Sequence, residues 1–457
     1  MMITTTTRRR LGVGTALLAS VALLAACGSG TPGQSADEDA QAGDREVVEF
    51  WHHTFTTPEN EWYEQVVEDF NASQDEIFVN STVVPGDAWD EKMTAAQAAG
   101  TAPDVYPVPG RLNDGVRLGS YLALDDLMPA EAFEQVTDAA AEISQVDGTW
   151  YGYPLLLEPQ RVLYWNKDIF AEAGLDPESP PTSWDELYEA CEQIQPVLAD
   201  GQFCIETFSD QDTLAWSTVA EQMHVAGHLP ISEDWTTAEA TDPAYEELIE
   251  HYTTLYDEGY IPRQSLAAGN SAAPFGEGEV AMITQGSWGM SELVADYPEV
   301  VESTGVAPTV TSDGNQTETL TTVGNFKWVI DANTDNAEAT AAFIEYVLAG
   351  DTDVLLPFFV NTQFTKAPAR EDVAEAVNAD PGAADAPWSE VITEDVVPYT
   401  IGEPLYPWDV NVAMGLAIQQ SMMGDTAPAD ALAEANATIE QIIEREDLPA
   451  NREELGD

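Results

Sequence analysis

Short apolar runs alternate with amphipathic stretches along most of the chain, which predicts sheets with helices packed against them. The runs at 47–51, 78–84 and 104–108 have the length and β-branched content of strands. Between them, residues 57–70 place apolar side chains at helical spacing, and residues 89–99 predict a second helix. Strands and helices that alternate at this spacing are typical of βαβ units and of a largely parallel sheet.

The alternation resumes after residue 180. Ser183 and Glu186 have the spacing of a capping box, which predicts a helix that continues through Ile194. No repeat with a period of 20–50 residues is present in the sequence, which argues against a solenoid or a propeller. We expect further strands at 203–205, 280–283 and 322–330, and further helices at 214–226, 245–258, 336–349, 408–423 and 428–443.

Residues 1–26 have the composition of an export signal. Three arginines, Arg8 to Arg10, precede an apolar run that is too short, at 1.5 Å per residue, to cross a hydrocarbon core of roughly 30 Å. The run ends in Leu-Ala-Ala-Cys-Gly around Cys27, which resembles the lipobox of bacterial lipoproteins. That resemblance implies that Cys27 is acylated and anchors the chain to the membrane; the alternative is an ordinary signal peptide with an incidental cysteine. Residues 27–45 contain no large apolar side chain, so we interpret them as a flexible tether.

Acidic residues dominate the charge of the chain. It has 82 Asp and Glu against 15 Lys and Arg, a formal net charge of −67, and loss of the signal arginines leaves 82 against 12, or −70. The carboxylates are spread among 12 Trp, 15 Tyr and 14 Phe, which is unlike an acidic disordered tail. Such a field repels nucleic acids and anionic lipids, so we expect neither as a partner. Dense carboxylate with only four lysines favours a halophilic, salt-adapted surface.

The two remaining cysteines predict one cross-link. Cys191 and Cys204 lie 13 positions apart in an exported chain, which favours a disulfide, with two free thiols as the alternative. We expect no metal and no cofactor. His224 and His228 are four residues apart, with Glu221 one turn earlier, but no further motif supports a metal site.

Five segments, in chain order, resemble motifs of the extracellular solute-binding proteins of ABC importers, in the carbohydrate-binding family that includes maltodextrin-binding protein. The resemblance covers roughly residues 46–445 behind the lipobox. The five segments are DGTWYGYP at 147–154, LYWNKDIF followed by AGL at 163–175, PPTSWDEL at 180–187, FGEGEVAM followed by GSW at 275–288, and DAL at 430–432.

The resemblance implies an α/β, two-lobed periplasmic-binding-protein-like fold of type II. Each lobe is then a mainly parallel sheet flanked by helices, and the chain crosses between lobes near residues 157–161, 314–322 and 361–368 to make a hinge. Closure of such a hinge encloses a solute between the lobes. We expect the first lobe at 46–158 and 320–364, and the second at 159–319 and 365–457.

The resemblance also transfers three binding residues. Trp288 ends the Gly-Ser-Trp segment where the family places a stacking aromatic, and Trp408 stands at the start of a C-terminal helix in a similar role. Glu158, in the first crossing, matches the family's sugar-binding glutamate. Flat aromatic faces and carboxylates suit the CH faces and hydroxyls of a sugar. The alternative for each tryptophan is ordinary core packing.

Further candidates follow the predicted strands, because α/β sheets bind ligands at the carboxyl ends of their strands. Each of them has core packing or a solvated surface as its alternative. They are Trp51, His52, Asp87, Arg111, Ser209, Asp210, Trp216, Asn325 and Trp328.

Arginine is scarce, with eight in the chain after the signal, which favours a neutral saccharide over a phosphorylated or carboxylated ligand. Arg111 and Arg161 remain available for one anionic group. The chain departs from the family pattern at Trp165, where Tyr is usual, and at His52 and His53, where small polar residues are common.

These features predict a monomeric substrate-binding component of an ABC sugar importer, anchored outside the cell after Sec or Tat export, that delivers its solute intact to permease subunits. It is not expected to be an enzyme: the motifs of serine hydrolases, zincins and P-loop proteins are missing from the sequence. The alternatives are a secreted glycoside hydrolase, a binding lipoprotein for a polyol or an amino acid, and a cell-surface adhesin.

The charge predicts a salt-dependent fold. At molar salt the Debye length is about 3 Å, so repulsion between surface carboxylates is largely screened. We expect the melting temperature to rise between dilute buffer and molar NaCl, measured by circular dichroism. An unchanged melting temperature would contradict the interpretation of the surface as salt-adapted.

Overall fold

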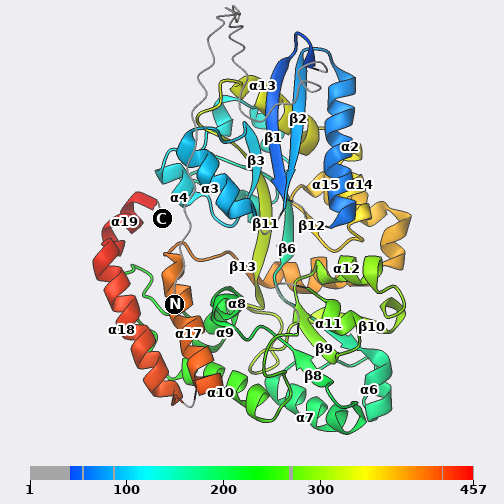
Figure 1. Cartoon of the computed structure of the whole chain (residues 1–457), viewed down its shortest axis with the longest axis vertical. Coiled ribbons are helices and arrows are strands. Elements are labelled where there is room, and N and C mark those ends of the chain that lie inside the picture. Colours follow the sequence, from blue (N-terminus) through cyan, green and yellow to red (C-terminus); the bar gives the residue numbers. More distant parts are fainter. Residues whose placement is uncertain (1–41, 54–55, 86–87, 267–270, 425, 456–457) are drawn as a thin grey trace, which may run out of the picture. The chain divides into compact units, whose positions relative to one another are not determined.

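The computed structural model of the chain describes residues 42–53, 56–85, 88–266, 271–424 and 426–455. The export signal, Cys27, most of the predicted tether and Asp87 lie outside these ranges. Residues 44–457 group into one compact unit, in which helices cover two β-sheets (Figure 1).

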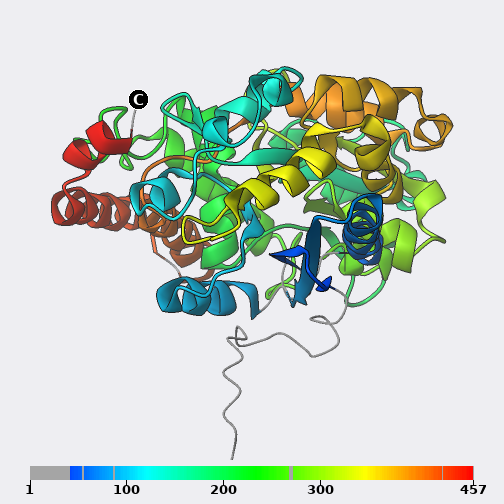
Figure 2. The same cartoon turned by 90° about the horizontal axis from the view of Figure 1, so that it is seen from above.

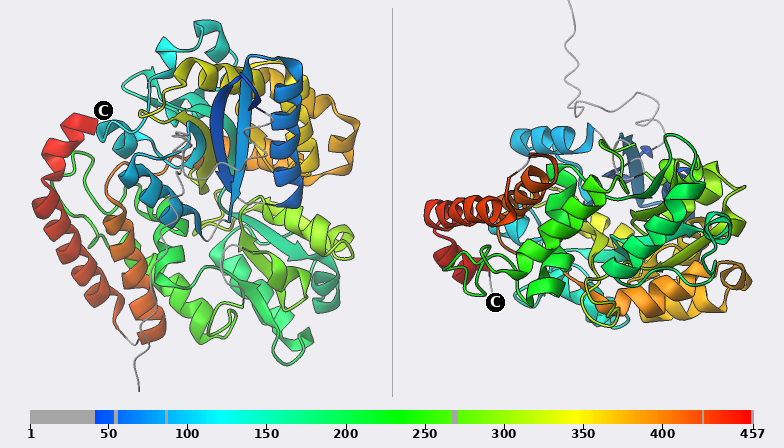
Figure 3. Two further views of the ribbon diagram at one scale, coloured as in Figure 1. Left: turned by 45° about the horizontal axis from the view of Figure 1, so that its top comes forward. Right: turned by 90° about the horizontal axis from the view of Figure 1, so that it is seen from below.

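Within the described ranges the first sheet has seven strands, in the order β12-β6-β11-β3-β1-β2 with β13 beside β11. β1 runs parallel to β2 and β3, and Figure 3 shows β1 and β2 side by side. β1 alternates buried residues, among them Val48 and Phe50, with more exposed ones, as expected for a strand with unlike faces. The strands are β1 (Glu46–His53), β2 (Ile77–Val84), β3 (Val105–Pro109), β6 (Tyr153–Pro159), β11 (Thr321–Ile330), β12 (Ala367–Pro368) and β13 (Thr400–Ile401).

The second sheet, in the described part of the chain, has four strands in the order β10-β7-β9-β8. β7 is antiparallel to both β9 and β10, and β8 is parallel to β9. Its strands are β7 (Val162–Asn166), β8 (Phe203–Glu206), β9 (Val280–Gln285) and β10 (Thr304–Pro308), and a separate small hairpin joins β4 (Gln145–Val146) to β5 (Thr149–Trp150).

Helices flank both sheets. Figures 1 and 2 show α17 and α18 packed side by side at one side of the molecule. Those up to the second sheet's last strand are α2 (Thr57–Ser73), α3 (Trp89–Ala99), α4 (Asn113–Arg117), α5 (Asp138–Glu142), α6 (Lys167–Ala173), α7 (Trp184–Ile194), α8 (Gln211–Ser217), α9 (Val219–Ala226), α10 (Ala244–Asp257), α11 (Ala273–Gly276) and α12 (Gly289–Asp296). The later ones are α13 (Ala337–Ile344), α14 (Thr352–Asn361), α15 (Glu371–Ala379), α16 (Trp388–Glu390), α17 (Trp408–Gly424), α18 (Pro428–Glu446) and α19 (Leu448–Leu455), with π-helical turns at Glu345–Ala349 and Val391–Val396.

The predicted start of α7 is confirmed, with one shift. The Ser183 hydroxyl accepts from the Glu186 amide at 3.2 Å, as a capping box requires. The Glu186 carboxylate, however, accepts from both the amide and the hydroxyl of Thr182, each at 2.8 Å, one residue before the predicted partner. The same two side chains therefore close the first turn of the helix, with Glu186 bound to Thr182.

The single helix expected at 214–226 is wrong, because the chain breaks there into α8 and α9 at Thr218. The Thr218 hydroxyl donates to the carbonyl of Leu214 at 2.7 Å, and the Gln222 amide donates back to that hydroxyl at 2.9 Å. A threonine that bonds to the carbonyl four residues earlier competes with the helix and bends it.

Two predictions about the sheets need correction. Neither sheet is mainly parallel, since β11 runs antiparallel to β3 and β6, and β7 runs antiparallel to both of its neighbours. A strand that returns from one sheet to the other enters from the opposite end and therefore runs against its neighbours. The boundary at residue 364 is also misplaced: β12 and β13 both pair within the first sheet, so the last departure from that sheet falls after Ile401.

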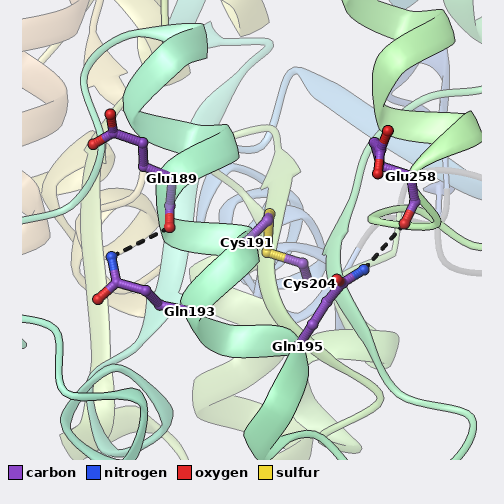
Figure 4. Close-up of a disulfide and its surroundings, with 6 residues drawn as sticks. All are labelled: Glu189, Cys191, Gln193, Gln195, Cys204 and Glu258. Atoms are coloured by element: carbon purple, nitrogen blue, oxygen red, sulfur yellow. Dashed lines mark hydrogen bonds between the residues drawn. A yellow bond between two sulfur atoms is a disulfide. The ribbon is translucent and has the colours of Figure 1, made fainter.

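The predicted disulfide is confirmed. Cys191 of α7 and Cys204 of β8 are bonded, with both sulfurs in the buried core of the second sheet (Figure 4). Nearby, the Gln195 side-chain amide donates to the carbonyl of Glu258 at the end of α10. The bond therefore fastens a helix to the strand that it covers.

Removing this cross-link is expected to lower the free energy of unfolding by about 3 kcal/mol, because the reduced unfolded chain regains the freedom of a short loop. Urea denaturation of the double variant Cys191→Ser, Cys204→Ser against the native protein measures the difference. Dithiothreitol should weaken the native protein and leave the variant unchanged. Equal midpoints for the two proteins would contradict the prediction.

Candidate binding site

A cavity of about 600 Å³ lies between elements of the two sheets. We call it the Trp288 cavity. The start of α2, β6, β11 and the end of α14 provide one wall, and the turn before α12 together with α12 provides the other. Its lining residues are Thr56, Thr57, Pro58, Glu59, Tyr63, Leu156, Glu158, Trp288, Ser291, Glu292, Ala295, Asp296, Phe326, Phe358 and Lys366.

Trp288 is held in place by a tight turn that follows β9. The Tyr164 hydroxyl lies within hydrogen-bond distance of the carbonyls of Gly286 and Ser287, at 2.8 and 3.1 Å. A Cβ at Gly286 would lie 2.1 Å from the Trp288 ring, so only glycine allows the indole to fold back over the turn. The turn thus fixes the Trp288 indole at the wall of the cavity.

The opposite wall carries a buried ion cluster, which we call the Lys366 triad. The Lys366 ammonium lies 2.5 Å from Oε2 of Glu158 and 3.0 Å from Oε1 of Glu59, and all three side chains are almost fully buried. Burial alone would lower the pKa of Lys366, but the two carboxylates raise it well above its ordinary value. The lysine therefore stays protonated, and its charge is outnumbered by two carboxylates.

His52 and Trp328 lie behind the cavity and do not reach it. The His52 ring is fully buried and stacks on Tyr63, with centroids 4.4 Å apart, while Trp328 is fully buried against Phe50 and Phe343. Tyr63 of α2 packs over both rings, so neither His52 nor Trp328 belongs to the lining of the Trp288 cavity. They support Tyr63, which does line the cavity.

A second, smaller cavity of about 190 Å³ gathers three other predicted residues: Arg111, Trp216 and Trp408. We call it the Trp408 cavity. Trp408 is half-exposed, with 49% of its surface accessible, which is unusual for the largest apolar side chain. The complete lining is Arg111, Asn113, Asp114, Gln160, Trp216, Val219, Thr322, Glu403, Pro404, Leu405, Tyr406, Trp408 and Asn411.

Ser209 and Asp210 lie apart from both cavities, at a polar recess of about 40 Å³. The Asp210 carboxylate caps α8, accepting from the amides of Asp212 and Thr213 at 3.1 Å and from the Thr213 hydroxyl at 2.6 Å. An N-cap is the ordinary structural role of such a residue. The prediction that Asp210 binds the ligand is not needed to explain its position.

The remaining candidates have structural partners. Asn325 is buried and accepts from the Lys327 ammonium, so its side chain is committed within the sheet. Half-buried Trp51 lies under the Lys92 ammonium, 4.0 Å from its ring centroid. Arg161, predicted to be available for an anion, is instead buried 2.5 Å from Glu221, because a buried guanidinium requires a counter-charge.

The three residues considered above as metal ligands, Glu221, His224 and His228, each have a different partner. The other oxygen of Glu221 accepts from the Tyr252 hydroxyl at 2.9 Å, while His224 contacts Asp313 and His228 contacts Asp242. No cluster of three metal-ligating side chains occurs in the described ranges.

Several cavity residues were missed by sequence reasoning. Tyr63 and Phe326 have the pattern of core residues, and Glu59 has that of a helix start. Lys366 carried a usable signal, since it is one of only four lysines in a chain of 457 residues. Gln160 and Glu403 of the Trp408 cavity carried none.

Comparison with known proteins agrees with this architecture. The family model for bacterial extracellular solute-binding proteins matches residues 56–354, well over half of the chain, and the chain belongs to this family. Among curated relatives, the sn-glycerol-3-phosphate-binding periplasmic protein UgpB of Brucella abortus (strain 2308) is 26% identical over 260 residues, which cover 53% of this chain and 58% of that protein. UgpB of Agrobacterium fabrum is 25% identical over 258 residues, with the same coverage of the two chains.

Solved structures share the fold. A solute-binding protein of an ABC transporter from Thermotoga lettingae, bound with α-D-tagatose, matches with a TM-score of 0.74 at 20% identity, over 87% of this chain and all of that chain. The cyclic α-maltosyl-1,6-maltose-binding protein of Arthrobacter globiformis matches with a TM-score of 0.68 at 24% identity, over 88% of this chain and all of that one. These likenesses confirm the two-lobed, type II periplasmic-binding-protein fold. In the described part of the chain, no helix has both the length and the apolar character that a bilayer span requires.

The histidines at the end of β1 predict an acid-sensitive fold. Burial lowers the pKa of His52 to about 4, and burial together with the neighbouring His52 charge lowers that of His53 to about 4. As the pH falls below about 6.5, the unfolded chain binds protons that the folded chain does not, so stability is lost between about pH 6.5 and 4.

We therefore expect the melting temperature to fall more steeply from pH 7 to pH 5 in the native protein than in the variant His52→Gln, which cannot titrate at this position. Scanning calorimetry at constant ionic strength measures both slopes. Parallel slopes would show that His52 does not contribute.

Proposed function

We propose that this protein is the lipid-anchored, extracellular substrate-binding component of an ABC sugar importer, which holds a neutral mono- or oligosaccharide in the Trp288 cavity and passes it intact to the permease. The observation that carries the proposal is the composition of that cavity. The aromatic faces of Trp288, Tyr63 and Phe326 adjoin the carboxylates of the Lys366 triad within about 600 Å³.

This combination suits the two kinds of surface that a sugar presents. Aromatic rings pack against the CH faces of a pyranose, and carboxylates accept hydrogen bonds from its hydroxyls. The volume lies within the range of small-molecule sites. The two structural neighbours, one bound with α-D-tagatose and the other a cyclic α-maltosyl-1,6-maltose-binding protein, support the same class of ligand.

The charge of the cavity favours a neutral solute over a phosphorylated one. The cationic side chain that lines the Trp288 cavity is Lys366, and it is already paired with two carboxylates. A phosphate normally requires arginine or an unpaired lysine as counter-charge. For this reason we favour a saccharide over the glycerol phosphate named for the UgpB relatives.

The glycoside hydrolase alternative is weakened by the same triad. Retaining and inverting hydrolases need one carboxylic acid that donates a proton and a second carboxylate that acts on the sugar or on water. Here burial raises the pKa of Glu158, but Glu59 and Glu158 both contact the same ammonium, so the two carboxyl groups are paired with Lys366 and do not face each other across an open site.

Anchoring and export are proposed from residues 1–45. The lipobox around Cys27 would place the folded unit on the outer face of the cell membrane, at the end of a short tether. We propose a monomer that meets the permease subunits in its closed form.

Tryptophan fluorescence during titration with glucose, mannose, tagatose, maltose and mannobiose tests this function, with chromatography of the mixtures to detect products. We expect a saturable change without any released sugar. Trp288→Ala should weaken binding by about 1–3 kcal/mol, and Trp288→Phe, which keeps a flat ring, by less. Trp235→Phe, in the core of the second sheet, is the matched control.

Release of shorter sugars would identify a hydrolase instead. Unchanged affinity in Trp288→Ala would move the binding site away from this cavity.

A further inference from the structure

The Trp288 and Trp408 cavities lie over the same face of the crossing strands. In the ladder between β6 and β11, Leu156 pairs with Phe326 and Glu158 with Gly324. The main-chain N–H of Gln160 continues the ladder by donating to the Thr322 carbonyl at 3.1 Å. Residues two apart on a strand share a face. A Cβ at Gly324 would lie 3.2 Å from Cγ of Glu158 and 3.4 Å from Cγ of Gln160, which places both side chains on that face.

The residues of this face divide between the two cavities in order along the strand. Leu156, Glu158 and Phe326 line the Trp288 cavity, whereas Gln160 and Thr322 line the Trp408 cavity. The two cavities are therefore consecutive parts of one floor, and the division falls between Glu158 and Gln160.

A hydrogen bond joins two residues of the Trp408 cavity next to that division. Nε2 of Gln160 donates to Oε1 of Glu403 at 3.0 Å. The Thr322 hydroxyl donates to Oε1 of Gln160, which orients the amide so that its nitrogen points at Glu403. Both Gln160 and Glu403 are only half-buried, so neither needs the other to remain solvated.

Glu403 belongs to the segment 402–407, which we call the strap and which leads from β13 to Trp408 at the start of α17. The Arg111 guanidinium binds the Glu403 carbonyl and lies against Gly402, and the Glu403 carboxylate also attracts Arg111. Loss of the carboxylate would remove its bond to Gln160 and leave the contact between Arg111 and the strap's backbone carbonyl.

We propose that the Gln160–Glu403 hydrogen bond is a partition that sets the length of saccharide the cleft accepts. With the bond intact, a short saccharide occupies the Trp288 cavity. A longer one must break the bond before it can place its next ring against the exposed indole of Trp408. The inference rests on the proposed function and adds a specificity-determining pair to it.

The test compares ligands of increasing length. Calorimetric Kd values are measured for maltose, maltotriose and maltotetraose, or for the corresponding mannose series if the fluorescence titration favours it. The quantity of interest is the length ratio, the Kd of the two-ring sugar divided by the Kd of the four-ring sugar. In Glu403→Ala we expect this ratio to rise at least tenfold over the native protein, and adding Trp408→Ala should cancel the rise.

Glu434→Ala, which removes an exposed carboxylate from α18, is the matched control and should keep the native ratio. Gln160→Ala removes the bond from its other end and serves if Glu403→Ala does not fold. A ratio within twofold of native in both partition variants, with normal saccharide binding, would overturn the partition alone. If the native protein bound monosaccharides but no oligosaccharide, the partition alone would fall; if it bound no saccharide at all, the proposed function would fall with it.

Discussion

The Lys366 triad is the interaction on which the arrangement of the cavity depends. It joins the first turn of α2, the end of β6 and the segment after α14, which are far apart in the chain: Glu158 and Lys366 alone are 208 residues apart. Because a buried ammonium is stable only with its counter-charges in contact, the three segments are held to within a hydrogen-bond length of one another. Glu59 also accepts from the Thr56 amide at 3.2 Å, so the same carboxylate closes the start of α2. The wall that faces Trp288 is therefore built from the start of a helix, a crossing strand and a lysine that lies far from both in the sequence.

Local pattern was sufficient for most of the individual elements. The helix expected at 89–99 is found as α3 with the same bounds, and the strand expected at 322–330 is found as β11 with one more residue. What the pattern could not give was direction. Whether β11 runs with or against β3 depends on which sheet the chain has just left, and no property of residues 321–330 records that. The break at Thr218 was likewise missed because helical periodicity continues through it.

The candidate site was predicted in part. Resemblance identified Trp288 and Glu158, and the structure places both in the same cavity. It separates Trp408 into a neighbouring cavity and buries His52 and Trp328, because the position of a residue after a strand says nothing about which helix will cover it. Tyr63, Phe326 and Lys366 belong to the cavity only through contacts between remote segments. A single sequence contains the residues of such contacts but not their proximity.

The scarcity of lysine has a practical consequence. Of the four lysines, Lys327 and Lys366 are buried, which leaves Lys92 on α3 and Lys167 on α6 as the side-chain amines that solvent can reach. One is carried by the helices of the first sheet and the other by those of the second. An amine-reactive dye pair or a bifunctional reagent would therefore mark each lobe once. The chain already carries two attachment points from which the distance between the helices of its two sheets can be measured with and without a sugar, without any engineered cysteine.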